Sequence, residues 1–273
     1  MTRLTLWTAF ETEASVPAWQ EPVPWLTPFE NACLARFRVP KRRREWLLGR
    51  FTAKRLVRDA APEVLGRTLL PQMFEIASED SGAPFVRDVS GERLPISITV
   101  SHARGAAFGA LLPVARGEGA IGGDVEWIEP RSPAFVYDFF TPAEAAAWDE
   151  SPPAERPLLA NAIWSAKESV LKALSLGLSV DTRAVEIRLS VAPADEPLRP
   201  REKNWRRFDA VCAAGIDAGE IPLSGLWSLR GPFVVTLAAR LSAPQGKDRH
   251  VDLRNDRRQG DDHAHGDLRP RAA

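Results

Sequence analysis

The 273-residue sequence has little cysteine, no net charge and no long apolar run, and each absence excludes a class of protein. Its two cysteines, Cys33 and Cys212, form neither a disulfide framework nor a metal-binding pattern, so we expect a reducing, cytoplasmic location. Lys and Arg together number 36, as do Asp and Glu, which leaves no overall charge for binding nucleic acid or a membrane. No apolar segment approaches membrane-spanning length, and the N-terminus is unlike a secretory signal.

The residues that are present indicate a globular core followed by a polar tail. Apolar residues make up 44% and charged residues 26%, which is ordinary for a globular protein. Basic residues are concentrated between Arg36 and Arg58, a surplus that suits a small anionic ligand better than a long polyanion. Residues 243–273 are almost free of apolar side chains, so we expect a disordered tail in which His263 and His265 are solvated.

Hydrophobic periodicity predicts a mixture of strands and helices. The predicted strands cover residues 3–10, 96–100, 106–112, 120–126, 184–189, 208–213 and 233–239. The predicted helices cover residues 40–60, 141–148 and 158–176, and the last is expected to stop at Gly177. Turns are expected at 81–84 and at Arg104-Gly105, the latter as part of a hairpin.

Two short segments carry the residues most suited to chemistry. Asp124 and Glu126 alternate on a strand and so face the same side, while Glu168 and Lys172 lie one turn apart on a helix. Taken singly, each is more often a solvated surface residue. If the fold brings them together, three carboxylates require a cation, and oxygen ligands favour Mg²⁺. A lysine beside Mg²⁺ provides a place for phosphate.

An internal similarity links the two main predicted helices. Residues 49–56 and 164–171 share the order small hydroxyl, Ala, Lys, charged residue, apolar residue. Together with the repeated order of strands and helices, this sequence similarity suggests two similar halves that face each other. The first half would supply basic groups and the second half carboxylates.

Four motifs in register resemble one enzyme family. They are Ser101-His102, Gly123-Asp124-Val125-Glu126, Phe139-Phe140-Thr141-Pro142-Ala143-Glu144 and Trp164-Ser165-Ala166-Lys167-Glu168-Ser169-Val170-Leu171-Lys172. Their order and spacing resemble the 4′-phosphopantetheinyl transferase superfamily, in its larger, two-halved, surfactin-synthetase-activating type. The resemblance covers roughly residues 36–190 and weakens toward residue 241.

The resemblance implies a reaction and a role for each matching residue. Coenzyme A would donate its phosphopantetheine arm to a serine of an apo acyl carrier protein or peptidyl carrier domain, releasing adenosine 3′,5′-bisphosphate. The implied Mg²⁺ ligands are Asp124, Glu126 and Glu168. The implied catalytic residues are Glu168 as general base and Lys172 as the cation on the transferring phosphate. The implied coenzyme A-binding residues are Arg50, which would hold the 3′-phosphate region, His102, which would contact a coenzyme A phosphate, and Ser101.

The first half also departs from the family pattern. Ala83 stands where members often carry lysine between glycine and proline, and Glu30, Asn31 and Cys33 occupy positions that are commonly basic. Arg44 and Lys54, with Arg43, are the candidates to compensate for this loss in binding coenzyme A.

We therefore expect an α+β protein with two pseudo-symmetric halves and an active site in the cleft between them. Residues 1–115 would form the basic, coenzyme A-binding half and 116–242 the half with the carboxylates and catalytic helix. A monomer serving polyketide or nonribosomal peptide biosynthesis is expected from the resemblance. The alternatives are a Mg²⁺-dependent diphosphate hydrolase and a degenerate, non-catalytic protein that binds coenzyme A or carriers.

Overall fold

A computed structural model describes residues 4–114, 117–177, 180–193, 198–200, 204–214, 216 and 223–241. Met1–Ala243 form one compact unit. The tail predicted at residues 243–273 lies outside the described residues, as do His263 and His265. None of the described helices is both long and apolar enough to cross a membrane.

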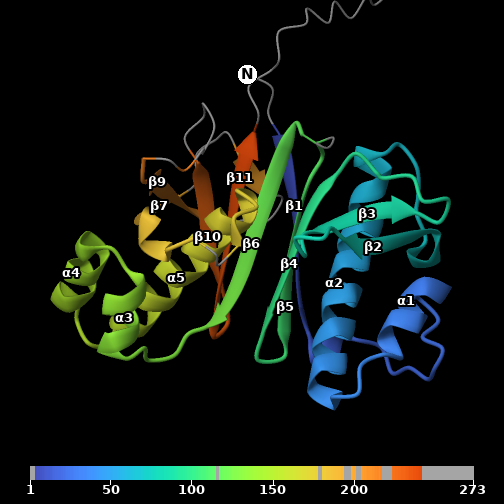
Figure 1. Ribbon diagram of the computed structural model, residues 1–273, viewed down its shortest axis with the longest axis horizontal. Helices are drawn as coiled ribbons and strands as arrows, with labels where there is room; N and C mark the ends of the chain where they lie inside the picture. Colours follow the sequence, from blue (N-terminus) through green and yellow to red (C-terminus); the bar gives the residue numbers. More distant parts are fainter. Residues whose placement is uncertain are drawn as a thin grey trace, which may run out of the picture. The chain divides into compact units, whose positions relative to one another are not determined.

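The elements follow one another in two similar blocks (Figure 1). The first contains β1 (Leu4–Thr12), α1 (Pro28–Leu34), α2 (Pro40–Val64), β2 (Phe74–Ser78), β3 (Pro84–Asp88), β4 (Ser97–Ala103) and β5 (Ala106–Leu112). The second contains β6 (Gly119–Trp127), α3 (Pro133–Phe139), α4 (Pro142–Glu150), α5 (Arg156–Ala173), β7 (Val185–Pro193), β8 (Leu198–Pro200), β9 (Arg206–Cys212), β10 (Ser224–Arg230) and β11 (Phe233–Leu241). Short 3₁₀ helices, η1 (Glu13–Ser15), η2 (Pro71–Met73) and η4 (Thr182–Ala184), complete the set.

The predicted helices and strands are all present, with small shifts at their ends. The α+β class is therefore confirmed. The elements that were not predicted are α1, α3, β8, β10, the 3₁₀ helices and the β2–β3 hairpin, of which the 81–84 turn alone was recognised. The hairpin turn between β4 and β5 has Arg104 and Gly105 at positive φ, as a tight turn between antiparallel strands requires.

Two sheets repeat one strand order. The first runs β4-β5-β1-β8 and the second β6-β11-β10-β9-β7. Antiparallel pairing makes β10-β11-β6 the counterpart of β4-β5-β1. The register agrees as well, because Thr12 pairs with the first residue of β5 and Trp127 with the first residue of β11. Glu11 and Glu126 are therefore equivalent, as are Ala9 and Asp124.

The sequence similarity of the two main helices extends to the contacts of the equivalent lysines, Lys54 and Lys167. Lys54 donates to Glu30 Oε2 at 2.7 Å and to the carbonyl oxygens of Pro71 and Phe74. Lys167 likewise pairs with Glu144 Oε2 at 2.8 Å and donates to two carbonyl oxygens, those of Thr182 and Val185.

Both glutamates belong to the same local motif. Glu30 and Glu144 each close a capping box, with the threonine of a Thr-Pro-x-Glu sequence, at the start of α1 and α4. The second carboxylate oxygen of each accepts from the backbone N–H of an isoleucine, Ile76 or Ile187, in the following strand. The two halves thus share side-chain architecture as well as topology. The boundary predicted between residues 115 and 116 remains a prediction.

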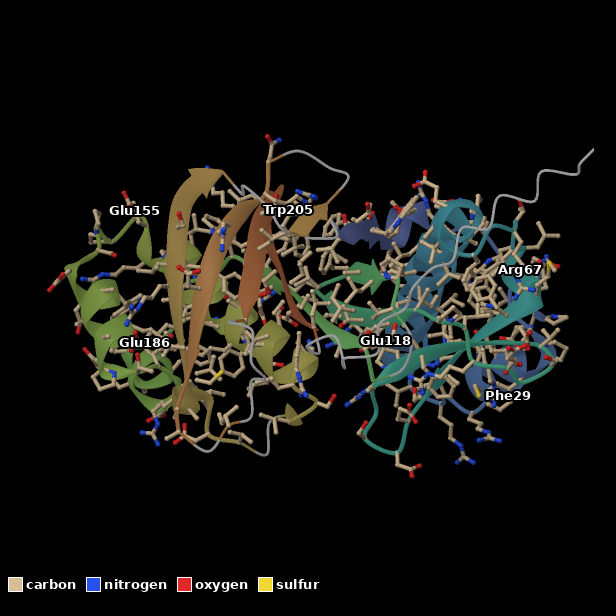
Figure 2. All side chains as sticks on the ribbon, turned by 90° about the horizontal axis from the view of Figure 1, so that it is seen from above. Phe29, Arg67, Glu118, Glu155, Glu186 and Trp205 are labelled. Carbon is tan, nitrogen blue, oxygen red and sulfur yellow. The ribbon has the colours of Figure 1, made fainter. Side chains whose placement is uncertain are left out.

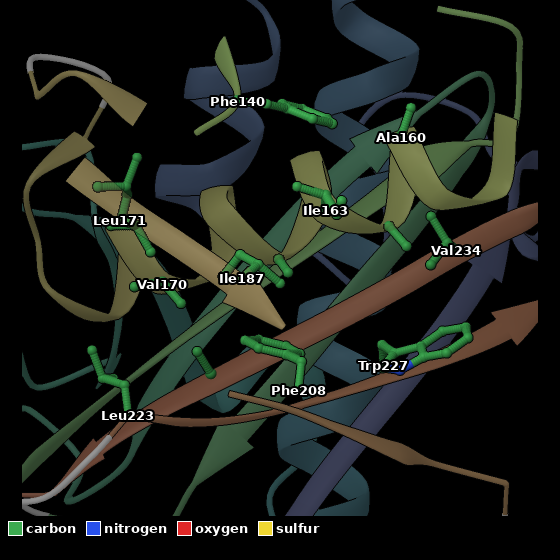
Figure 3. Packing of buried hydrophobic residues seen from close by; sticks show 14 of the residues in the cluster. Phe140, Ala160, Ile163, Val170, Leu171, Ile187, Phe208, Leu223, Trp227 and Val234 are labelled. Atoms are coloured by element: carbon green, nitrogen blue, oxygen red, sulfur yellow. The ribbon is translucent and has the colours of Figure 1, made fainter. Parts of the chain in front are cut away.

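The helices pack on the sheets and leave β4 and β6 adjacent at the centre (Figure 1). Helix α2 lies on β1 and β5, and α5 on β6 and β11. Seen from above, Phe29 and Arg67 mark the first half, Glu155 and Glu186 the second, and Glu118 lies between them (Figure 2). The core of the second half packs apolar residues of α5 against β7, β9, β10 and β11 (Figure 3). It includes Phe140, Ile163, Val170, Leu171, Ile187, Phe208, Trp227 and Val234.

Candidate active site

Strand β6 brings Asp124 and Glu126 to the junction of the halves. Asp124 lies opposite Thr236 of β11 and is buried, while Glu126 is partly buried near the end of the strand. Alternation along the strand directs both side chains to the same face. The strand expected at residues 120–126 is confirmed.

Helix α5 can lie directly on β6 because Gly122 has no side chain. A Cβ at Gly122 would lie 1.9 Å from the carbonyl oxygen of Ser169, so only glycine allows this approach. Ser165 and Ser169 hydrogen-bond the Thr236 hydroxyl at 2.9 and 2.6 Å and fix the helix on the sheet. The same helix carries Glu168 and Lys172.

Three hydroxyls of β4 join the halves at this point. Ser97 Oγ accepts from the N–H of Ile121 at 3.2 Å, and Thr99 Oγ1 accepts from the N–H of Gly123 at 3.0 Å. Ser101 Oγ donates to Asp124 Oδ1 at 2.7 Å. Sequence reasoning selected Ser101 but not Ser97 or Thr99, although the alternation of these three hydroxyl residues was visible in the strand.

Lys172 lies between the carboxylates from the strand and the helix. Its ammonium donates to Asp124 Oδ1 at 2.8 Å and lies 3.9 Å from Glu168 Oε2. It also donates to the carbonyl oxygen of Gly123 at 3.3 Å and to Ser101 Oγ at 3.4 Å. Asp124, Glu168, Lys172 and Ser101, predicted from distant parts of the chain, thus share one site.

Glu126 is held by residues that sequence reasoning did not select. Arg131 donates to Glu126 Oε2 at 2.8 Å and, through Nε, to Asn161 Oδ1 at 2.8 Å. Asn161 is fully buried on α5 and donates to the carbonyl oxygens of Glu129 and Pro157. The available signal was Asn161 between the apolar neighbours Ala160 and Ala162, because a buried amide needs such partners.

Burial and charge shift the pKa values at this site. Burial raises the pKa of Glu126, and the charge of Asp124 raises it further, to about 7, although Arg131 and Trp164 act against the rise. Burial likewise raises the pKa of Glu168, while Lys172 opposes this effect. Burial lowers the pKa of Lys172, but Asp124, Glu168 and Glu126 together outweigh it and raise the pKa. When ionised, the three carboxylates outnumber the two cations Lys172 and Arg131 at this site.

The donor set fits a hard divalent cation in chemical type. Asp124 Oδ2 is buried and has no hydrogen-bond partner, so one carboxylate oxygen is left for a ligand. The described residues nevertheless contain no cluster of three acidic, histidine or cysteine side chains arranged to hold a metal ion. Lys172 occupies one oxygen of Asp124, and Arg131 occupies one oxygen of Glu126.

The remaining predicted ligand-binding residues do not reach this group. His102 is exposed on β4, on the face opposite Ser101. Arg50 stacks on Trp46 at 4.8 Å, and burial beside α1 lowers its pKa. Arg44 is exposed, 4.0 Å from Glu13.

Lys54 requires a correction. Its side chain is buried and its three donated contacts go to Glu30, Pro71 and Phe74, so none is left for coenzyme A. The prediction that Lys54 compensates for the missing basic residues is therefore wrong in this structure.

A pocket of about 650 Å³ opens beside Lys172. It is lined from the first half by the 79–84 turn, Arg93 and the start of β4, and from the second half by the start of β6 and the end of α5. Ala83, the position of the missing lysine, is part of this lining. Among the described lining residues, Arg44, Arg50, Lys54 and His102 do not occur.

Comparison with known proteins gave a match to a family model and a similarity to solved structures. A family model described as the 4′-phosphopantetheinyl transferase superfamily matches residues 120–213, and no curated protein sequence matches. Among solved structures, the chain is similar to the holo-[acyl-carrier-protein] synthase of Thermotoga maritima, with 17% identity and a TM-score of 0.35. That similarity covers 45% of this chain and 63% of the other, which is less than two thirds of its length. The segment that matches the family model contains Asp124, Glu126, Glu168 and Lys172.

Proposed function

We propose that this protein transfers the 4′-phosphopantetheine arm of coenzyme A to a serine of an apo acyl or peptidyl carrier protein, with release of adenosine 3′,5′-bisphosphate. The observation that carries the proposal is the contact of Lys172 with Asp124, 2.8 Å, beside Glu168 and inside the segment that matches the transferase family. The pocket beside Lys172 is the proposed site for coenzyme A.

Mg²⁺ is the proposed cofactor, with Asp124, Glu126 and Glu168 as its ligands. The partnerless oxygen of Asp124 and the surplus of carboxylate charge support this choice. When bound, Mg²⁺ would withdraw charge from the diphosphate oxygens. Asp124 can contribute through Oδ2 while Lys172 keeps Oδ1, and Arg131 donates to one oxygen of Glu126, Oε2.

Glu168 and Lys172 have complementary roles in the proposed reaction. The carrier serine must lose a proton as it attacks the diphosphate, and Glu168 is the proposed acceptor, directly or through water. Burial raises the pKa of Glu168 and so makes it a stronger base than an exposed carboxylate. Lys172, with its raised pKa, keeps its charge and stabilises the negative charge that develops on the diphosphate.

The acceptor is proposed to be a carrier protein rather than water. The decisive test incubates the protein and coenzyme A with several apo carriers from fatty acid, polyketide and nonribosomal peptide systems, followed by mass spectrometry. Carrier modification that requires added Mg²⁺ and stops with EDTA is the expected result. Hydrolysis of coenzyme A without any carrier indicates the diphosphate hydrolase instead, and binding without turnover indicates the non-catalytic alternative.

A further inference from the structure

The pocket beside Lys172 contains a second cation whose role the motifs do not explain. Among the described residues that line it, Arg93 and Lys172 carry positive side chains, and Glu79 and Asp80 carry negative ones. Lys172 is committed to the carboxylates of β6 and α5. Arg93 comes from the other half, on the segment between β3 and β4.

Arg93 is held in a fixed orientation. Its guanidinium lies 4.5 Å from the centre of the Phe85 ring and forms an ion pair with Glu79. The side chains of Arg93 and Glu79 are 32% and 33% exposed, so a ligand in the pocket can reach the pair. A planar guanidinium stacked on a ring presents its N–H donors in a fork that matches carboxylate and phosphate oxygens.

We infer that Arg93 binds the 3′-phosphate of coenzyme A, an inference that rests on the proposed function. Coenzyme A carries a 5′-diphosphate and a separate 3′-phosphate. Lys172 is assigned to the diphosphate because it lies beside the proposed base, so the 3′-phosphate needs another cation. Ala83 lies in the same lining and provides no cation. Arg93 would replace its ion pair with Glu79 by an ion pair with the phosphate, which carries more negative charge than a carboxylate.

Arg87 on the neighbouring strand β3 provides a matched control. Its side chain is also 32% exposed, pairs with Glu75 at 2.8 Å, and stacks on Phe29 at 5.2 Å. Arg87 and Arg93 even form a backbone bridge with each other. Arg87 is absent from the described residues that line the pocket. The two arginines therefore differ mainly in access to the proposed ligand.

The test is calorimetric titration of the wild-type protein, R93Q and R87Q with coenzyme A and with dephospho-coenzyme A, which lacks the 3′-phosphate. R93Q should bind coenzyme A about tenfold more weakly, because a charge-assisted hydrogen bond is lost, and should bind dephospho-coenzyme A as the wild type does. R87Q should match the wild type for both. E79Q should bind coenzyme A more tightly, since a competing carboxylate is removed.

Two results overturn the inference. One is that R93Q binds coenzyme A and dephospho-coenzyme A more weakly by the same factor, which would mean that Arg93 contacts a part of coenzyme A other than the 3′-phosphate. The other is equal behaviour of R93Q and R87Q toward coenzyme A. Failure of the wild-type protein itself to bind coenzyme A is a different result, because it contradicts the proposed function on which the inference rests.

Discussion

Arg55 and Glu168 occupy equivalent positions in the two halves but carry opposite charges. Each directly follows the buried lysine of its helix. Arg55 lies 2.7 Å from Glu11, the strand residue equivalent to Glu126, and so neutralises it from the helix. In the second half the helix contributes a further carboxylate, and Asp124 stands where the first half has Ala9. The surplus negative charge therefore exists in one half only.

This asymmetry predicts that Glu168 and Arg55 respond differently to neutralisation. E168Q keeps the size of the side chain and should retain the fold, while transfer to an apo carrier falls by about 100-fold or more because the proposed base is lost. R55Q removes a partly exposed cation outside the pocket and should keep transfer near the wild-type rate. Mass spectrometry of the carrier measures both. Wild-type turnover by E168Q would remove Glu168 from the mechanism.

Sequence reasoning predicted the residues of the candidate site because its signals were local. The spacing of Asp124 and Glu126 fixes a shared strand face, and that of Glu168 and Lys172 fixes a shared helix face. The periodicity of α5 and the stop near Gly177 were enough to place the second pair on one helix. Their convergence was a hypothesis from the family resemblance, and the contact of Lys172 with Asp124 supports it.

Lys54 shows where that reasoning fails. Arg50, Lys54 and Arg55 are similar basic residues along one helix, and nothing local tells which of them is buried. Lys54 is buried because Glu30 closes the start of α1 and presents a carboxylate to it, a contact made only in the folded chain. The Thr-Pro-x-Glu sequence at 141–144 begins a helix that was predicted, whereas the same sequence at 27–30 was not used and would have predicted α1 and the equivalent lysine partner.

The close approach of α5 to β6 predicts that Gly122 does not tolerate a side chain. In G122A the new Cβ would meet the backbone of Ser169 and Ala173, which cannot move independently of the helix. We expect destabilisation by about 3 kcal/mol or more, measured by urea unfolding, and loss of transfer as Lys172 moves from Asp124. G49A is the control, because its Cβ would lie 3.5 Å from Val100 Cγ1, an ordinary contact. It should unfold within about 1 kcal/mol of the wild type. Equal stability of both variants would contradict the close approach.

The buried pairs Lys54–Glu30 and Lys167–Glu144 predict matching stability effects. K54M and K167M each leave a buried glutamate without its ion-pair partner, so each should lower the free energy of unfolding by about 3–5 kcal/mol. Replacing the whole pair, as in K167M/E144L, should restore part of this loss, although Ile187 also loses the acceptor of its N–H. Chemical denaturation of all three variants measures this. A K167M protein as stable as the wild type would show that the ion pair is not stabilising in solution.

The surplus of carboxylate charge at Asp124, Glu126 and Glu168 predicts that Mg²⁺ stabilises the folded protein in the absence of coenzyme A. A ligand that binds only the folded state raises the free energy of unfolding with its concentration, so millimolar Mg²⁺ should raise the melting temperature by a few degrees, about 2–4 °C for each kcal/mol. D124N loses the carboxylate whose Oδ2 lacks a partner and should show no such rise. D59N removes the exposed aspartate at the position equivalent to Lys172 and should keep it. Differential scanning fluorimetry with Mg²⁺ and with EDTA measures all three proteins. An equal rise in melting temperature for D124N and the wild type would show that Mg²⁺ binds elsewhere. The chemistry assigned to these carboxylates would then have to be assigned elsewhere too.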